Sequence, residues 1–102
     1  MKKTVLYLSG AMTGKPDLNF PAFHAAAADL RARGFDVINP AELDAADTSP
    51  MTWEQYLRRD IRHLMGADRI ALLPGWEHSR GAKLELHIAT ALGMSAMFLE
   101  PA

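Results

Sequence analysis

Short apolar runs alternate with longer amphipathic segments along the chain. The runs are residues 4–8, 35–38, 70–73 and 94–99; Asp36 interrupts the second and Ser95 the fourth, and a Gly, Pro or Asn residue lies within two positions of each run. Continuous apolar runs of this length are typical of strands that are buried on both faces of a parallel sheet. The pattern therefore predicts four strands.

The segments between these strands carry apolar residues at helical spacing. The first helix is expected to begin at Pro21 and to end before Gly34, which suits the left-handed position after a helix. The second opens at Thr52, which forms a capping-box pattern with Gln55, and the third opens after Ser79. Residues 41–51 are mostly polar or small and lack periodicity, so they are predicted to form a loop and to serve as a lid.

This alternation of strands and helices predicts an α/β fold. We expect a three-layer, flavodoxin- or Rossmann-like domain over residues 1–102, with a four-stranded parallel sheet of order 2-1-3-4 and helices on both faces. In that order the loops after the first and third strands lie side by side at the carboxyl edge of the sheet. Open α/β sheets bind their ligands at this edge.

Composition narrows the range of partners. The 102 residues carry a net charge of −1 without a basic stripe, so neither a nucleic acid polymer nor an anionic membrane is an expected partner. The chain has no cysteine, which excludes disulfides and thiolate chemistry. The first apolar run is too short for a signal peptide and no segment approaches the ~18 apolar residues of a membrane span, so we expect a cytoplasmic protein.

Two carboxylates occupy apolar helix faces. Glu85 lies at helical spacing from Ala82 and Ile88, without a basic residue three or four positions away. Asp60 lies in the stripe of Leu57 and Leu64, with His63 as a local partner. Each carboxylate is either a functional group at the sheet edge or a surface ion pair, and the pattern leaves both alternatives open.

Two familiar active-site motifs nearly occur and fail, and two other kinds of signature are absent. Gly10 to Lys15 is one residue short of a P-loop and is followed by Pro16, and the dinucleotide-binding glycine pattern is absent. Glu77 stands where a nucleophile elbow around Ser79 needs glycine, which argues against a serine hydrolase. The four histidines share no metal-ligand spacing, so neither a metal nor a cofactor is expected.

The helix that opens at Ser79 offers free N–H groups and a hydroxyl. These groups suit an anion or a sugar hydroxyl, although simple capping of the helix by Ser79 explains the serine equally well. Tyr7 places a phenol where a buried strand usually has an aliphatic side chain, and it is either a site residue or a core aromatic.

The residues together resemble a known superfamily. Tyr7-Leu-Ser-Gly-Ala-Met after the first strand, Arg59-Asp60-Ile, Ala67-Asp68 and Ser79-x-Gly81-x-x-x-Glu85 follow one another as in the nucleoside 2-deoxyribosyltransferases and the related deoxynucleoside 5′-monophosphate N-glycosidases. The resemblance covers nearly the whole chain and is greatest to a short branch common in phages and prophages. It implies cleavage of the N-glycosidic bond of a (deoxy)nucleoside or its 5′-monophosphate.

The resemblance also implies residue roles. Glu85 matches the nucleophile that attacks C1′ of the sugar, Asp60 the carboxylate that assists protonation of the leaving base, and Tyr7 the tyrosine that orients the nucleophile. The positions that match contacts to the sugar or the 5′-phosphate are Ser9, Gly10, Ser79 and Gly81. A nucleophilic carboxylate beside a second acidic group is also the arrangement of retaining glycosidases.

The chain departs from this pattern at its end, because relatives continue beyond the fourth strand with a segment that completes a neighbouring subunit's site. We therefore expect hydrolysis rather than base transfer, and a homo-oligomer, because Met51, Trp53 and Trp76 predict apolar surface. Two alternatives remain at this point. One is a nucleotide-binding module without catalysis, and the other is a purely structural protein.

Overall fold

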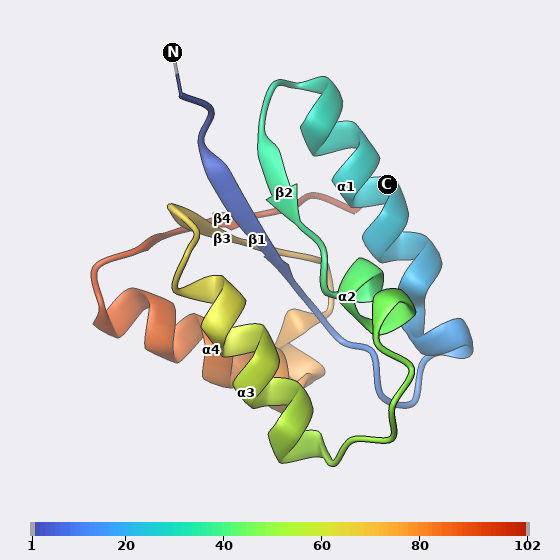
Figure 1. Cartoon of the computed structure of the whole chain (residues 1–102). Helices are drawn as coiled ribbons and strands as arrows, with labels where there is room; N and C mark the ends of the chain where they lie inside the picture. The colour runs from blue at the N-terminus through green and yellow to red at the C-terminus, as the bar shows by residue number, and fades with distance from the viewer. Residues whose placement is uncertain (1, 102) are drawn as a thin grey trace.

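The computed structural model describes residues 2–101, whose four strands form one parallel sheet in the order β2-β1-β3-β4 (Figure 1). The strands are β1 (Val5–Ser9), β2 (Asp36–Ile38), β3 (Arg69–Leu72) and β4 (Ser95–Phe98). The central strand β1 pairs with β2 on one side and with β3 on the other. The predicted fold class and strand order are confirmed.

Helices cover both faces of the sheet. They are α1 (Phe20–Ala32), α2 (Pro40–Ala46), α3 (Trp53–Leu64) and α4 (Arg80–Ala91), with short 3-10 turns η1 (Pro16–Asn19) and η2 (Trp76–His78). The predicted capping box forms at the start of α3, where the Thr52 and Gln55 side chains each bond the backbone of the other residue. Gly34 follows α1 with a φ of 98°, as the sequence predicted.

The prediction of a loop over residues 41–51 is wrong for its first half, which forms α2. Asn39 caps this helix by accepting a hydrogen bond from the backbone N–H of Ala41, and Pro40 occupies the first turn. Ala41 is buried against the core, so tertiary packing supplies what periodicity did not show. The irregular stretch is confined to residues 47–52.

Two apolar clusters form, one on each face of the sheet. Leu6 and Leu8 of β1 pack with α1, whereas Tyr7 belongs to the cluster that includes Leu64 of α3 and Ala89 of α4. Successive strand side chains point to opposite faces, so Tyr7 and Ser9 both face the α3–α4 layer. This alternation brings the polar groups of β1 to the helix that carries Glu85.

The segment before α1 is sharply bent. Asp17, Leu18 and Asn19 are consecutive residues with φ values of 52°, 53° and 62°, a left-handed conformation that is unfavourable for a leucine. The Asn19 side chain donates a hydrogen bond to the backbone carbonyl of Ala11, which ties the bend to the loop after β1. The bend places Leu18 at the wall of the pocket described below.

Candidate active site

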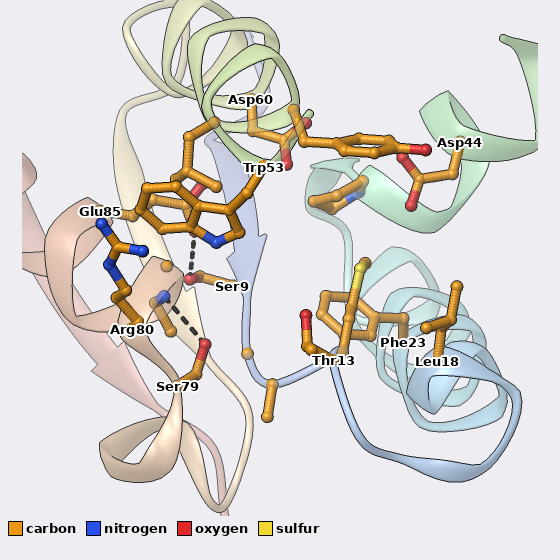
Figure 2. Close-up of a pocket in the computed structure, with 18 of the residues that line it drawn as sticks. Ser9, Thr13, Leu18, Phe23, Asp44, Trp53, Asp60, Ser79, Arg80 and Glu85 are labelled. Atoms are coloured by element: carbon orange, nitrogen blue, oxygen red, sulfur yellow. Dashed lines mark hydrogen bonds between the residues drawn. The ribbon is translucent and has the colours of Figure 1, made fainter. Parts of the chain in front are cut away.

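A cavity of about 740 Å³ opens at the carboxyl edge of the sheet. Its walls come from the end of β1 and the loop after it, from α3, from the start of α4 and, on the opposite side, from α1 and α2 (Figure 2). The volume falls within the range of ~300–1,000 Å³ that is usual for small-molecule sites. The predicted position of the site, beside the loops after β1 and β3, is where this cavity lies.

Glu85 lies at the floor of this cavity. Its Oε2 accepts a 2.6 Å hydrogen bond from the Tyr7 hydroxyl, and its Oε1 accepts a 2.7 Å bond from the Ser9 hydroxyl. The side chain is only 5% exposed, and Tyr7 and Ser9 are buried completely or nearly so. Among residues 2–101 no basic side chain forms a salt bridge with Glu85, so the ion-pair interpretation of this residue does not apply.

Burial changes the acidity of this group. Removal from water raises the pKa of Glu85 from 4.5 to about 7, while the hydrogen bonds from Tyr7 and Ser9 act in the opposite direction by stabilising the anion. The negative charge of nearby Asp60 raises the pKa further. Burial and the neighbouring carboxylates raise the pKa of the Tyr7 phenol well above its ordinary range, so Tyr7 remains a hydrogen-bond donor.

Asp60 lies on α3 and lines the same cavity, with a side-chain exposure of 13%. Its partner is the adjacent Arg59, whose Nε and Nη2 donate to Asp60 Oδ1 at 3.0 and 2.9 Å. Arg59 Nη2 also donates to Oδ1 of Asp44 on α2. Of the two alternatives for Asp60, the surface ion pair with His63 is not formed, because its salt-bridge partner is Arg59. Burial is the largest effect on the pKa of Asp60 and raises it.

The start of α4 forms another wall of the cavity. Ser79 caps the helix, because its Oγ accepts a 3.1 Å bond from the backbone N–H of Ala82. The guanidinium of Arg80 stacks on the ring of Trp53, with the Arg80 Cζ atom 3.8 Å from the ring centroid (Figure 2). The stack joins the first residues of α3 and α4 beside the cavity.

The seven site residues predicted from the sequence all line this cavity. They are Tyr7, Ser9, Gly10, Asp60, Ser79, Gly81 and Glu85. Gly10 has a packing reason of its own, because a Cβ atom there would come within 2.9 Å of the Leu73 side chain. Sequence reasoning missed Asp44, because the segment around it shows no helical periodicity. It gave no role to Arg59, although Arg59 belongs to the Arg59-Asp60-Ile motif, and none to Arg80.

The described part of the chain has neither a metal site nor a membrane-spanning helix. No group of three or more His, Asp or Glu side chains in residues 2–101 is placed to hold a metal ion. Within the same residues, no helix has the length and apolar character that crossing a bilayer requires.

Comparison with known families gives one match over most of the chain. Residues 4–98 match the model of a family described as "Domain of unknown function (DUF4406)". The chain belongs to this family. No curated protein matches the sequence.

The fold of this DUF4406 chain is shared with a solved enzyme structure. It is similar to 2-deoxyribosyltransferase from the psychrotolerant bacterium Bacillus psychrosaccharolyticus, with a TM-score of 0.74 and 21% sequence identity. The match covers 93% of this chain and 71% of that chain. At this identity the likeness shows a common fold, and the chemistry of the DUF4406 chain has to be argued from its own residues.

Proposed function

We propose that the protein cleaves the N-glycosidic bond of a nucleoside or its 5′-monophosphate, with Glu85 as the nucleophile. The observation that carries the proposal is the arrangement at the cavity floor, where hydroxyl donors hold both oxygens of a buried carboxylate. Such donors orient the anion without neutralising it, as a carboxylate nucleophile requires. A solved structure with the same fold belongs to a deoxyribosyltransferase, which supports the same class of reaction.

In this mechanism, ionised Glu85 attacks C1′ of the sugar and the C1′–N bond breaks. The bonding electrons pass to the base nitrogen, and Asp60 delivers a proton to the departing base. The product is a glycosyl ester of Glu85, which water then hydrolyses while the Asp60 carboxylate takes up the proton that water loses. Two acidic groups with different environments divide the roles of nucleophile and acid in this way.

The ends of the cavity differ in charge. Ser79 and Arg80 lie at the start of α4, where free N–H groups and a guanidinium favour an anion, whereas Asp44 lies across the cavity on α2 (Figure 2). Asp60 lies on α3 about two turns from Trp53, the residue on which Arg80 stacks. We therefore orient the substrate with its 5′ end towards Arg80 and its base towards the acidic side, with C1′ above Glu85. A 5′-monophosphate uses both ends of the cavity and is the preferred substrate in this proposal.

The first test is release of free base. A panel of nucleosides and 5′-monophosphates is incubated with the protein, and free base is measured by chromatography. Glu85→Gln should lower turnover by about four orders of magnitude, since it removes the covalent nucleophile. The matched control is Glu77→Gln, because Glu77 is an exposed glutamate of η2 outside the cavity. Near wild-type turnover by Glu85→Gln would exclude Glu85 as the nucleophile.

The second test traps the intermediate. In a 2′-fluorinated deoxynucleoside, fluorine destabilises the oxocarbenium-like transition states, so both formation and hydrolysis of the glycosyl ester become slow. A good leaving base restores the rate of ester formation alone, and the ester accumulates. Mass spectrometry should then find the glycosyl group on the peptide that contains Glu85. With excess second base, free sugar identifies a hydrolase and exchanged nucleoside a transferase. Binding without base release would identify a nucleotide-binding module.

A further inference from the structure

A mostly buried cluster of three charged side chains joins α2 to α3 beside the cavity. Arg59 donates to Oδ1 of Asp60 through Nε and Nη2 and to Oδ1 of Asp44 through Nη2. The side-chain exposures of Arg59, Asp44 and Asp60 are 15%, 15% and 13%. The Arg59 guanidinium also lies over the ring of Tyr56, with Cζ 5.3 Å from the centroid, so its position is fixed by three neighbours.

One member of the cluster, Arg59, does not line the cavity. Asp44 and Asp60 line the cavity (Figure 2). Arg59 therefore acts on a ligand only through the two carboxylates. Its bonds occupy Oδ1 of Asp60, and the Asp60 carboxyl group accepts no other hydrogen bond from residues 2–101, so Oδ2 is the oxygen that remains for a ligand.

Stability does not account for the cluster. The Nη1 atom of Arg59 is buried and has no hydrogen-bond partner within residues 2–101, which costs free energy. Asp44 and Asp60 also share one guanidinium, and the Glu85 carboxyl lies near Asp60, so negative charge is in excess among side chains of the cluster that are at most 15% exposed. Such an arrangement favours retention of a proton on one of the carboxyl groups.

We propose that Asp44 and Arg59 are positioning residues that hold Asp60 in the orientation in which it protonates the leaving base. This inference rests on the proposed function. When the Asp60 O–H bond breaks and its proton moves to the base nitrogen, Arg59 stabilises the carboxylate that is formed. Asp44 opposes that stabilisation because its negative charge repels the Asp60 carboxylate and because it competes for the same Arg59 guanidinium. Asp60 therefore remains a proton donor.

The groups around Asp60 agree with this balance. Burial raises the pKa of Asp60 most; Arg59 of α3 lowers this pKa, Asp44 of α2 raises it, and His63 of α3 lowers it. The carboxyl of Glu85 on α4 also faces Asp60, as does the Tyr7 phenol from β1. The two positioning residues thus act on Asp60 in opposite directions.

The test compares leaving groups that do and do not need a proton. An ordinary nucleoside monophosphate requires protonation of its base, whereas an N7-methylated adenine nucleotide carries a cationic base that departs as a neutral molecule. If the cluster acts through the Asp60 proton, Asp44→Asn and Arg59→Met should lose about 100-fold in kcat on the ordinary substrate, as expected for a misplaced group. Both variants should regain most of that loss on the methylated substrate, and Asp60→Asn should follow the same pattern.

For an enzyme restricted to pyrimidines, a 5-fluorinated base replaces the methylated purine as the better leaving group. Arg59→Lys serves if Arg59→Met does not fold, because it keeps the charge but loses the fork that holds two carboxylates. The matched control is Glu42→Gln, which breaks the Arg31–Glu42 pair on the exposed side of the same helix α2. This control should keep wild-type rates on both substrates.

The outcomes separate the two proposals. Equal losses on both substrates, or the same loss in Glu42→Gln, would show that Asp44 and Arg59 only support the local structure and would overturn the positioning role. If the wild-type protein releases base from neither substrate, or if Glu85→Gln still cleaves the methylated one, the proposed function itself fails. Wild-type cleavage that depends on Glu85, with losses specific to the leaving group, is the result expected from both.

Discussion

The exchange Glu85→Gln is expected to stabilise the folded protein at alkaline pH. The folded-state pKa of Glu85 is raised from 4.5 to about 7, so folding favours the protonated carboxyl. The contribution of protonated Glu85 to the stability of the folded state is fully present below pH 4.5 and is lost as the pH rises through 7. Above pH 7 the folded protein holds a buried carboxylate at a cost of about 3 kcal/mol, at about 1.4 kcal/mol for each pH unit. Glutamine has no charge to bury and removes this cost.

The geometry permits the exchange without leaving a polar atom unpaired. The Tyr7 hydroxyl can donate to the amide oxygen of a glutamine, and the Ser9 hydroxyl can turn and accept from its amide nitrogen. Chemical denaturation of both proteins at pH 5 and pH 8.5 measures the effect. The free energy of unfolding of Glu85→Gln should exceed that of the wild type by little at pH 5 and by about 3 kcal/mol at pH 8.5. The larger difference corresponds to a rise in Tm on the order of 10 °C.

The comparison within one pH removes the contributions of other titrating groups that the two proteins share. A gap that does not change with pH, or a variant that is less stable than wild type at pH 8.5, would refute the argument that burial of the Glu85 charge is costly. The expected combination of lost turnover and gained stability is characteristic of a functional group that the fold holds at a disadvantage.

Further predictions follow from the same geometry. Tyr7→Phe removes one donor to the Glu85 anion and should lower kcat/KM about tenfold or more, with the pKa of Glu85 shifted upward in the pH–rate profile; an unchanged profile would contradict an orienting role. An N7-methylated adenine nucleotide needs no proton from the enzyme, so its kcat/KM with the wild type should depend on the ionisation of Glu85 alone. After spontaneous release of base is subtracted, kcat/KM should rise with pH through about 7 and then level off. Arg80→Ala should raise KM for a monophosphate about tenfold and leave KM for the free nucleoside unchanged, which steady-state kinetics with both substrates can check. Light scattering at micromolar concentration should find a homo-oligomer, as Met51, Trp53 and Trp76 predict from the sequence; Phe98, which is 55% exposed beside Trp76, adds apolar surface, and a monomer would contradict the prediction.

Much of the fold was readable because strand burial leaves a strong signal. The short runs rich in apolar residues located all four strands to within one or two residues, and the helix signals at Thr52 and Ser79 marked real caps. Strand order followed from chain order and from the handedness of crossover connections. These features depend on local sequence and general rules, which is why they could be predicted.

The prediction failed where tertiary contacts decide the structure. The segment from Pro40 to Ala46 is too short to show periodicity, and one buried residue, Ala41, anchors it to the core. Because this helix was missed, Asp44 was placed in a lid instead of at the cavity wall. The same error concealed the Asp44–Arg59 contact, since the residues are 15 positions apart and no spacing rule connects them.

The candidate site was only partly accessible from sequence for a related reason. The position of Glu85 on an apolar helix face indicated burial, but its donors come from β1, 76 and 78 positions away. Nothing in the local pattern of β1 distinguishes a structural Tyr7 from a functional one. The two become connected only when the strand's alternation and the helix's periodicity are placed against each other in the fold.

This combination of periodicities also explains how a small fold builds a reactive carboxylate. A strand directs every second residue to one face, so Tyr7 and Ser9 reach the same layer, spaced to meet the two oxygens of one carboxylate. Helix α4 presents Glu85 between the buried residues Ala82 and Ala89, whose small side chains let the helix pack closely on the sheet. Burial raises the pKa while the two donors restrain that rise, and their balance leaves the group near the point of ionisation at neutral pH. A longer side chain at position 82 or 89 would move the helix away from β1 and separate the carboxylate from its donors, so the geometry of the site depends on the packing of its apolar neighbours.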